Sequence, residues 1–177
     1  MKYTLVSVVT FVTMVLAGCQ LSEKKNQENL IADAKIDTSV VAILPFDSST
    51  VWLEENGKPA ELSDKEYSEV ETILNNCIKT YNIEQEKEMK RIKENYSNAE
   101  VNRENFVIEL KNYKRQYIVF TSSKQEKIVW INCLCDASGN YWKKELQLVD
   151  DGGNCYFNIR INLNTKQGYD LMVNGVA

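Results

Sequence analysis

The clearest pattern in the chain is the strict alternation of apolar and polar residues between Cys155 and Leu163. Side chains alternate between the two faces of a β-strand, so this pattern predicts a half-buried strand. Its apolar face carries Cys155, Phe157, Ile159, Ile161 and Leu163. Such a strand needs partner strands beside it and an apolar layer over one face.

Further strands are predicted at residues 40–46, 113–121, 126–135, 141–149 and 169–173, with a short edge strand at 51–53. The segment 126–135 is apolar on both faces, which is typical of a central strand. Turns rich in Gly, Ser and Asn separate most of the later strands. Short turns of this kind favour antiparallel pairing of successive strands.

A long amphipathic helix is predicted to begin at Ser63, because Glu66 follows it in capping-box register. Its apolar stripe, at spacings of three and four, consists of Tyr67, Val70, Leu74, Cys77, Ile78 and Tyr81. This stripe can cover one face of the sheet. Residues 82–98 either prolong this helix or form another one, and residues 83–112 as a whole form a second helix or a covering loop.

The order of elements predicts an α+β fold, in which a long helix packs on a four- to five-stranded antiparallel meander. In outline this order resembles the cystatin-like arrangement. The sequence contains no cystatin inhibitory motif, so the resemblance implies an architecture and no activity.

The first residues have the features of an export signal. Met1 and Lys2 precede the apolar segment 3–16, which is too short for an ordinary membrane-spanning helix, and Leu16-Ala17-Gly18-Cys19 follows. This segment resembles the lipobox of bacterial lipoproteins. The resemblance implies cleavage before Cys19 and attachment of a diacylglycerol through a thioether at Cys19, so that the mature chain is held at a membrane by its acyl chains.

This interpretation divides the chain into three parts. Residues 1–18 are a signal peptide, residues 19–39 a flexible tether, and residues 40–177 a single α+β domain. The residue after Cys19 is Gln20 rather than an acidic residue, as in lipoproteins that are not retained at the inner membrane. The expected location is therefore the outer membrane, with the domain facing the periplasm. The segments 151–157 and 173–177 are also similar to those of uncharacterised lipoproteins of the Bacteroidota, a resemblance that names no activity.

Composition removes several classes of function. The chain contains no His, which excludes Ser-His-Asp and Cys-His catalysis and His-based zinc sites. Its formal charge is −4, with an isoelectric point near 5.1 and no basic stripe, so no nucleic-acid partner is expected. No cofactor is expected either.

Four cysteines follow Cys19, namely Cys77, Cys133, Cys135 and Cys155. An even number in an exported domain predicts disulfides. The predicted strand 141–149 would separate Cys155 from Cys133 and Cys135, so we expect a disulfide from Cys77 to a strand cysteine, with Cys133 or Cys135 preferred. A bond from Cys155 to either of these would require a different strand order.

Aromatic residues mark a candidate binding surface on the sheet face away from the helix, formed by Trp130, Trp142 and Tyr156. Exposed aromatic side chains there would indicate recognition, whereas aromatic side chains covered by residues 83–112 would indicate a second small core. The leading hypothesis is a non-enzymatic, lipid-anchored envelope protein that binds a protein or glycan partner. An inhibitor of an envelope hydrolase or protease is one form of it.

The alternative hypothesis belongs to a different class. In it, the chain is a metal carrier or an enzyme that uses the thiolates of Cys133, Cys135 and Cys155, because such ligands suit copper(I) or zinc.

Overall fold

A computed structural model describes residues 35–137 and 139–175 of the chain. Cys19 and residues 1–34 lie outside this part, so the signal peptide, the lipid attachment and most of the tether stay predictions. The described chain begins beside the fold. Ile36 packs against the main apolar core, and the Asp37 carbonyl accepts hydrogen bonds from the backbone N–H groups of Val40 and Val41.

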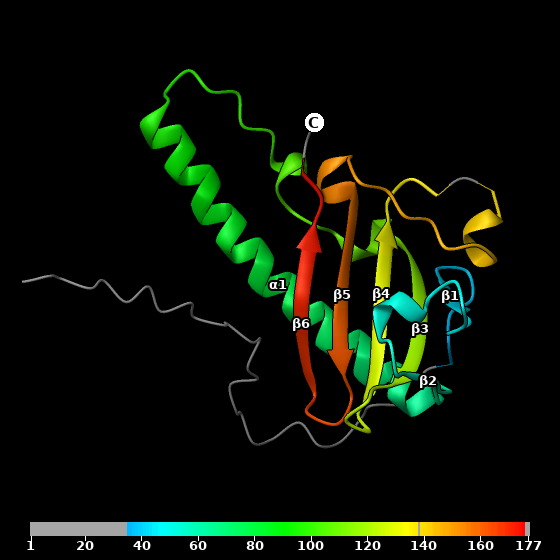
Figure 1. Cartoon of the computed structure of the whole chain (residues 1–177). Helices are drawn as coiled ribbons and strands as arrows, with labels where there is room; N and C mark the ends of the chain where they lie inside the picture. Colours follow the sequence, from blue (N-terminus) through cyan, green and yellow to red (C-terminus); the bar gives the residue numbers. More distant parts are fainter. Residues whose placement is uncertain (1–34, 138, 176–177) are drawn as a thin grey trace, which may run out of the picture.

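The described residues form one mixed sheet with a long helix behind it (Figure 1). Four strands make an antiparallel meander: β3 (Lys114–Thr121), β4 (Lys127–Leu134), β5 (Tyr156–Asn162) and β6 (Gln167–Val173). The α+β class is therefore confirmed, and β4 is central as predicted. The predicted four- to five-stranded, purely antiparallel arrangement is wrong, because the sheet of the described residues has six strands and β1 (Val41–Leu44) runs parallel to β3. The short β2 (Lys58–Pro59) pairs with the other end of β3.

Two segments predicted as strands are not strands. Residues 51–53 form a 3₁₀ turn, η1 (Val51–Leu53), and residues 141–149 begin with another, η4 (Tyr141–Lys143), before continuing outside the sheet. The segment 141–149 buries Trp142 against the outer sheet face, and the side chain of Gln116 hydrogen-bonds its backbone in place of a neighbouring strand. An alternating pattern alone does not distinguish a strand within the sheet from a segment that packs on the face of the sheet.

The helix α1 (Asp64–Asn95) begins where the sequence predicted. The Ser63 hydroxyl accepts a hydrogen bond from the Glu66 N–H, and the Glu66 carboxylate accepts one from the Ser63 N–H, at 2.9 Å. The predicted stripe is buried at Tyr67, Val70, Leu74, Cys77 and Ile78. Residues 82–95 prolong the same helix. A helix of 32 residues measures about 48 Å, well beyond an eight-residue strand of about 26 Å, so its last turns extend past the sheet (Figure 1).

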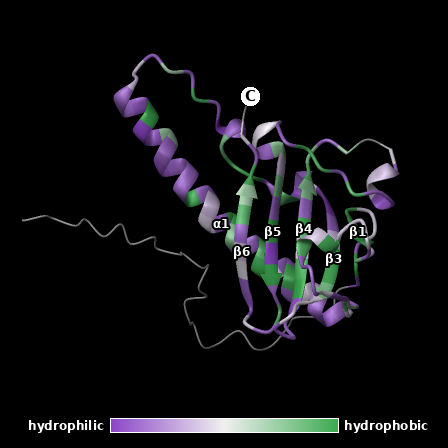
Figure 2. Ribbon diagram, viewed as in Figure 1, coloured by the Kyte–Doolittle hydropathy of each residue, from purple (hydrophilic) through white to green (hydrophobic). Residues whose placement is uncertain are grey.

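The main core lies between α1 and the sheet (Figure 2). The helix and the sheet approach each other closely at Gly168 in β6, where a Cβ atom would lie 2.6 Å from the Cys77 Sγ. At the same interface, Arg115 is buried and its Nε lies 3.2 Å from the Glu71 carboxylate, which also accepts a hydrogen bond from the Tyr117 hydroxyl. Burial, the largest single effect, favours a lower pKa for Arg115, but the charge of Glu71 together with smaller contributions from Tyr117, Cys133 and Tyr67 outweighs it, so the pKa is raised. This ion pair therefore ties α1 to β3 in its charged form.

Candidate functional site

The outer sheet face, away from α1, is partly covered by two segments, residues 46–53 and the described part of residues 137–149, which omits residue 138. Phe46 and Leu53 pack with Ile118, Phe120, Ile128 and Trp130 of the sheet, while Trp142 packs with Ala42 and Leu134. The structure thus has two smaller apolar clusters on this face, covered by these segments rather than by residues 83–112.

The residues of the predicted aromatic surface belong to these two clusters, Trp130 to one and Trp142 with Tyr156 to the other. Trp130 and Trp142 are each only 3% exposed, and Tyr156 is half-buried and packs beside Trp142. Of the two outcomes that the sequence left open for these residues, the structure shows covered side chains, although residues 83–112 do not form the cover. Trp130 and Trp142 therefore do not form a binding surface.

Trp52 is the exposed tryptophan of the outer layer. It is 55% exposed, and its ring meets Trp130 edge to face with centroids 5.8 Å apart. Its indole N–H donates to the Ser49 carbonyl oxygen at 3.0 Å, so the polar atom of the ring is already paired within the fold. Trp52 thus presents a fixed apolar ring to the solvent. From the sequence, Trp52 was one of several aromatic residues that could line a carbohydrate or peptide surface, but the 3₁₀ turn that exposes it was not predicted, because an edge strand was expected at 51–53.

A surface depression of about 410 Å³ lies beside Trp52, between the two covering segments. One wall comes from residues 44–52 and the other from residues 144–148. Its apolar lining is Leu44, Pro45, Trp52, Leu146 and Leu148, and its polar lining is Asp47, Ser49, Thr50, Lys144 and Glu145. Volumes in this range are typical of small-ligand pockets.

Local hydrogen bonds fix the first wall. Asp47 Oδ1 accepts from the Ser49 N–H at 2.8 Å and from the Ser49 hydroxyl at 2.7 Å, and the Thr50 hydroxyl oxygen accepts from the Asp47 N–H at 2.8 Å. The two bonds from Ser49 lower the pKa of Asp47, because they favour the ionised carboxylate. The wall therefore carries a permanent negative charge at neutral pH.

Gln116 fixes the second wall from beneath. This side chain is fully buried, and its Nε2 donates to the carbonyl oxygens of Trp142 at 2.6 Å and Glu145 at 2.7 Å. Its Oε1 accepts from the Gln147 N–H at 3.0 Å and from Asn132 Nδ2 at 3.0 Å. Three of these four hydrogen bonds hold the segment that carries Lys144, Glu145 and Leu148, and the fourth joins Gln116 to Asn132 of β4.

Further exposed residues lie across the outer face from Trp52. Trp130, beneath Trp52, lies opposite Arg160 on the neighbouring strand β5, and Arg160 in turn lies opposite Tyr169 on β6. Arg160 donates to the Leu53 carbonyl oxygen at 3.1 Å, and Tyr169 and Met172 are exposed. Trp, Tyr, Arg and Met are the side chains enriched in protein recognition surfaces.

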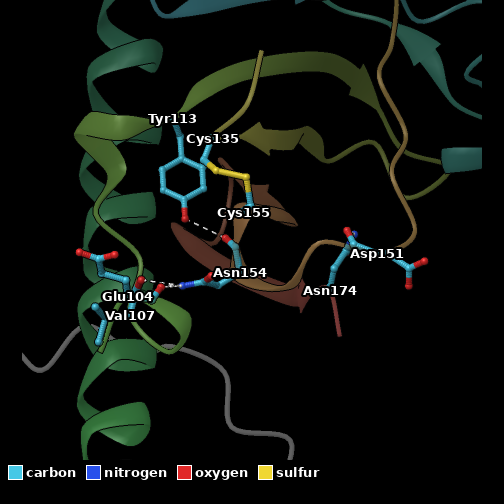
Figure 3. The surroundings of a disulfide bond; sticks show 8 residues. All are labelled: Glu104, Val107, Tyr113, Cys135, Asp151, Asn154, Cys155 and Asn174. Atoms are coloured by element: carbon cyan, nitrogen blue, oxygen red, sulfur yellow. Dashed lines mark hydrogen bonds between the residues drawn. A yellow bond between two sulfur atoms is a disulfide. The ribbon is translucent and has the colours of Figure 1, made fainter. Parts of the chain in front are cut away.

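The disulfide differs from the predicted one. It joins Cys135 to Cys155, with their Cα atoms 4.9 Å apart, at the adjacent ends of β4 and β5 (Figure 3). The expected crosslink from Cys77 is wrong, and so is the argument that strand 141–149 keeps Cys155 away. Cys77 and Cys133 are both buried in the helix-side core.

This pairing also removes the thiolate set of the metal-carrier alternative. Cys135 and Cys155 are oxidised to a disulfide, and burial raises the pKa of the Cys133 thiol well above its usual value. In the part of the chain that the structure describes, no group of three or more His, Cys, Asp or Glu side chains is arranged to hold a metal ion.

A second depression, of about 360 Å³, lies beside the disulfide. Most of its polar groups are engaged within the fold (Figure 3). The Asn154 amide donates to the carbonyl oxygens of Glu104 and Val107, both at 2.8 Å, and the Tyr113 hydroxyl donates to the Asn154 carbonyl oxygen at 2.7 Å. We therefore regard this depression as a structural junction and the one at Trp52 as the candidate site.

The fold and site define an α+β protein with a surface depression beside an exposed tryptophan on the outer layer of its sheet. No protein-family model, curated protein or solved structure matches the chain. The resemblances to cystatins and to lipoproteins therefore stay predictions from the sequence.

Proposed function

We propose that this chain is a lipid-anchored envelope protein whose folded domain binds a protein or glycan partner and catalyses no reaction on it. Recognition takes place at the depression beside Trp52. Inhibition of an envelope hydrolase or protease is one form of such binding.

The exposure of Trp52 is the observation that carries the proposal. Burying the apolar ring of a tryptophan is favourable, and the same fold buries Trp130 and Trp142 almost completely. Trp52 instead stands at the rim of a depression, beside Leu148, which is 58% exposed. Exposed apolar residues gathered at a concave surface with a polar rim are typical of binding sites.

The proposal is tested by photo-crosslinking in intact cells. A diazirine-bearing amino acid in place of Leu148 should form a covalent adduct with the partner, since diazirines insert into both proteins and sugars. Adduct yield should fall at least about tenfold when Trp52→Ala is added, because aromatic anchors dominate the free energy of binding. The control is the same crosslinker in place of Tyr141, which is exposed but lies outside the depression. Equal yields with and without Trp52 would overturn the proposal.

A further inference from the structure

Two features of the depression indicate the chemistry of its ligand. The first is the Trp52 ring, which offers an apolar face with no unpaired polar atom, because its N–H is bound to Ser49. Such a face stacks on the C–H side of a pyranose ring, which is also apolar and nearly flat. The edge-to-face contact with Trp130 holds this ring in place before any ligand binds, so little entropy is lost on stacking.

The second feature is the polar rim. Asp47 is an ionised acceptor fixed by Ser49, while Lys144 is a donor and Glu145 an acceptor on the opposite wall. Among the described residues, neither Lys144 nor Glu145 forms an ion pair. Sugar hydroxyls both donate and accept hydrogen bonds, and charge-assisted bonds of this kind are the stronger ones.

An extended peptide fits this surface less well. A peptide adds to a sheet by pairing its main chain with an edge strand. The chain leaves β1 at Pro45, in the wall of the depression, and proline has no N–H to donate. Recognition here therefore depends on side chains placed around an aromatic ring.

From these features we infer that the depression binds a saccharide, with one pyranose ring stacked on Trp52 and its hydroxyl groups bound by Asp47, Lys144 and Glu145. This inference rests on the proposed function and names its ligand class. The net charge of the three rim side chains is negative, so neutral and amino sugars are accepted and polyanionic glycans are disfavoured.

The inference is tested with the protein on a glycan array and then by calorimetric titration with the oligosaccharides that bind. Candidate probes include N-acetylglucosamine oligomers, maltohexaose and cellohexaose. Trp52→Ala should weaken binding at least about tenfold, and Trp52→Phe should restore part of it because an aromatic ring returns. Asp47→Asn should weaken binding about tenfold, since the hydrogen bond loses its charge. Tyr141→Ala is the matched control and should bind as the unchanged protein does.

The outcomes separate the inference from the proposed function. Saccharide binding that is lost in Trp52→Ala and kept in Tyr141→Ala supports both. Failure to bind any saccharide on the array, together with a protein adduct at position 148, overturns the saccharide and leaves the binding module standing. Failure of both measurements overturns both. Saccharide binding unaffected by Trp52→Ala overturns this site.

Discussion

A single buried amide organises the outer layer at the scale of residues. Gln116 replaces the ladder of a missing strand with side-chain hydrogen bonds to residues 142, 145 and 147. A buried polar group is stable only when it is fully hydrogen-bonded. Here the Gln116 amide and the backbone of residues 142–147 supply hydrogen-bond partners to each other. The wall of the candidate site therefore depends on a residue that does not line it.

Gln116→Leu should accordingly destabilise the fold and displace that wall. The substitution removes the hydrogen bonds that Gln116 makes to two carbonyl oxygens, to the Gln147 N–H and to the Asn132 amide, and the expected cost is about 3 kcal/mol in the free energy of unfolding. Urea unfolding followed by circular dichroism measures it, with Gln85→Leu on α1 as the control. A loss no larger than that of the control would show that the amide does not hold the segment.

Tyr113 makes the stability of the fold sensitive to alkali. Burial, with smaller contributions from Cys133 and Tyr81, raises its pKa to about 12, whereas an unfolded tyrosine ionises near pH 10. Because the folded pKa is the higher one, its contribution is fully present below about pH 10 and is lost as the pH rises towards 12.

The free energy of unfolding should therefore fall across this interval, and the fall should be smaller in Tyr113→Phe. Urea titrations at a series of pH values measure both. Tyr113→Phe also lowers stability at neutral pH through loss of the bond to the Asn154 carbonyl, so the slope with pH is the relevant quantity. An unchanged slope would contradict the assignment.

At the scale of elements, predictions succeeded where the cause was local. The start of α1 follows from Ser63 and Glu66, and its buried face follows from residue spacing alone. The segment 141–149 could not be predicted, because its conformation depends on Gln116 in a distant strand. This error also produced the wrong disulfide, since without a strand there β4 and β5 become neighbours.

The candidate site was harder to predict than the fold. The sequence indicated aromatic residues on the outer face, but whether each is buried depends on which segment covers it. Trp130 lies under Trp52, so the exposed residue is the one contributed by the covering segment. The Glu71–Arg115 ion pair was also not predicted, because the sequence does not indicate which charged residue of the helix contacts which charged residue of a strand.

The disulfide closes the loop that carries the second wall of the depression. Cys135 and Cys155 are 20 positions apart, and a loop of this size implies about 3 kcal/mol of stabilisation in the chain-entropy model. Replacing both residues with serine should lower the free energy of unfolding by this amount. Non-reducing peptide mapping of the unchanged protein should recover a Cys135–Cys155 peptide, and a crosslinked peptide containing Cys77 would contradict the structure.

At the scale of the whole molecule, the proposed attachment to a membrane depends on Cys19. The proposal assigns this anchoring to acyl chains on Cys19. No helix within residues 35–137 and 139–175 is both long and apolar enough to cross a bilayer. Two or more acyl chains are needed for stable binding, which agrees with the diacylglycerol that the lipobox implies.

Cys19→Ala should abolish acylation and release the protein from the membrane fraction, while the folded domain keeps its circular dichroism spectrum. Metabolic labelling with a palmitate analogue and cell fractionation measure the two effects. Continued fractionation with the membrane would contradict anchoring at this residue.

Recognition at Trp52 is tested most directly by oxidative footprinting of the purified protein, with mass spectrometry of each tryptophan and of Tyr141. Without a partner, Trp52 should be oxidised faster than Trp130 and Trp142, because it alone of the three is exposed. Solubilised envelope material from the host cell should protect Trp52 and leave oxidation of Tyr141 unchanged. Undiminished oxidation of Trp52, or equal protection of Tyr141, would contradict recognition at this site.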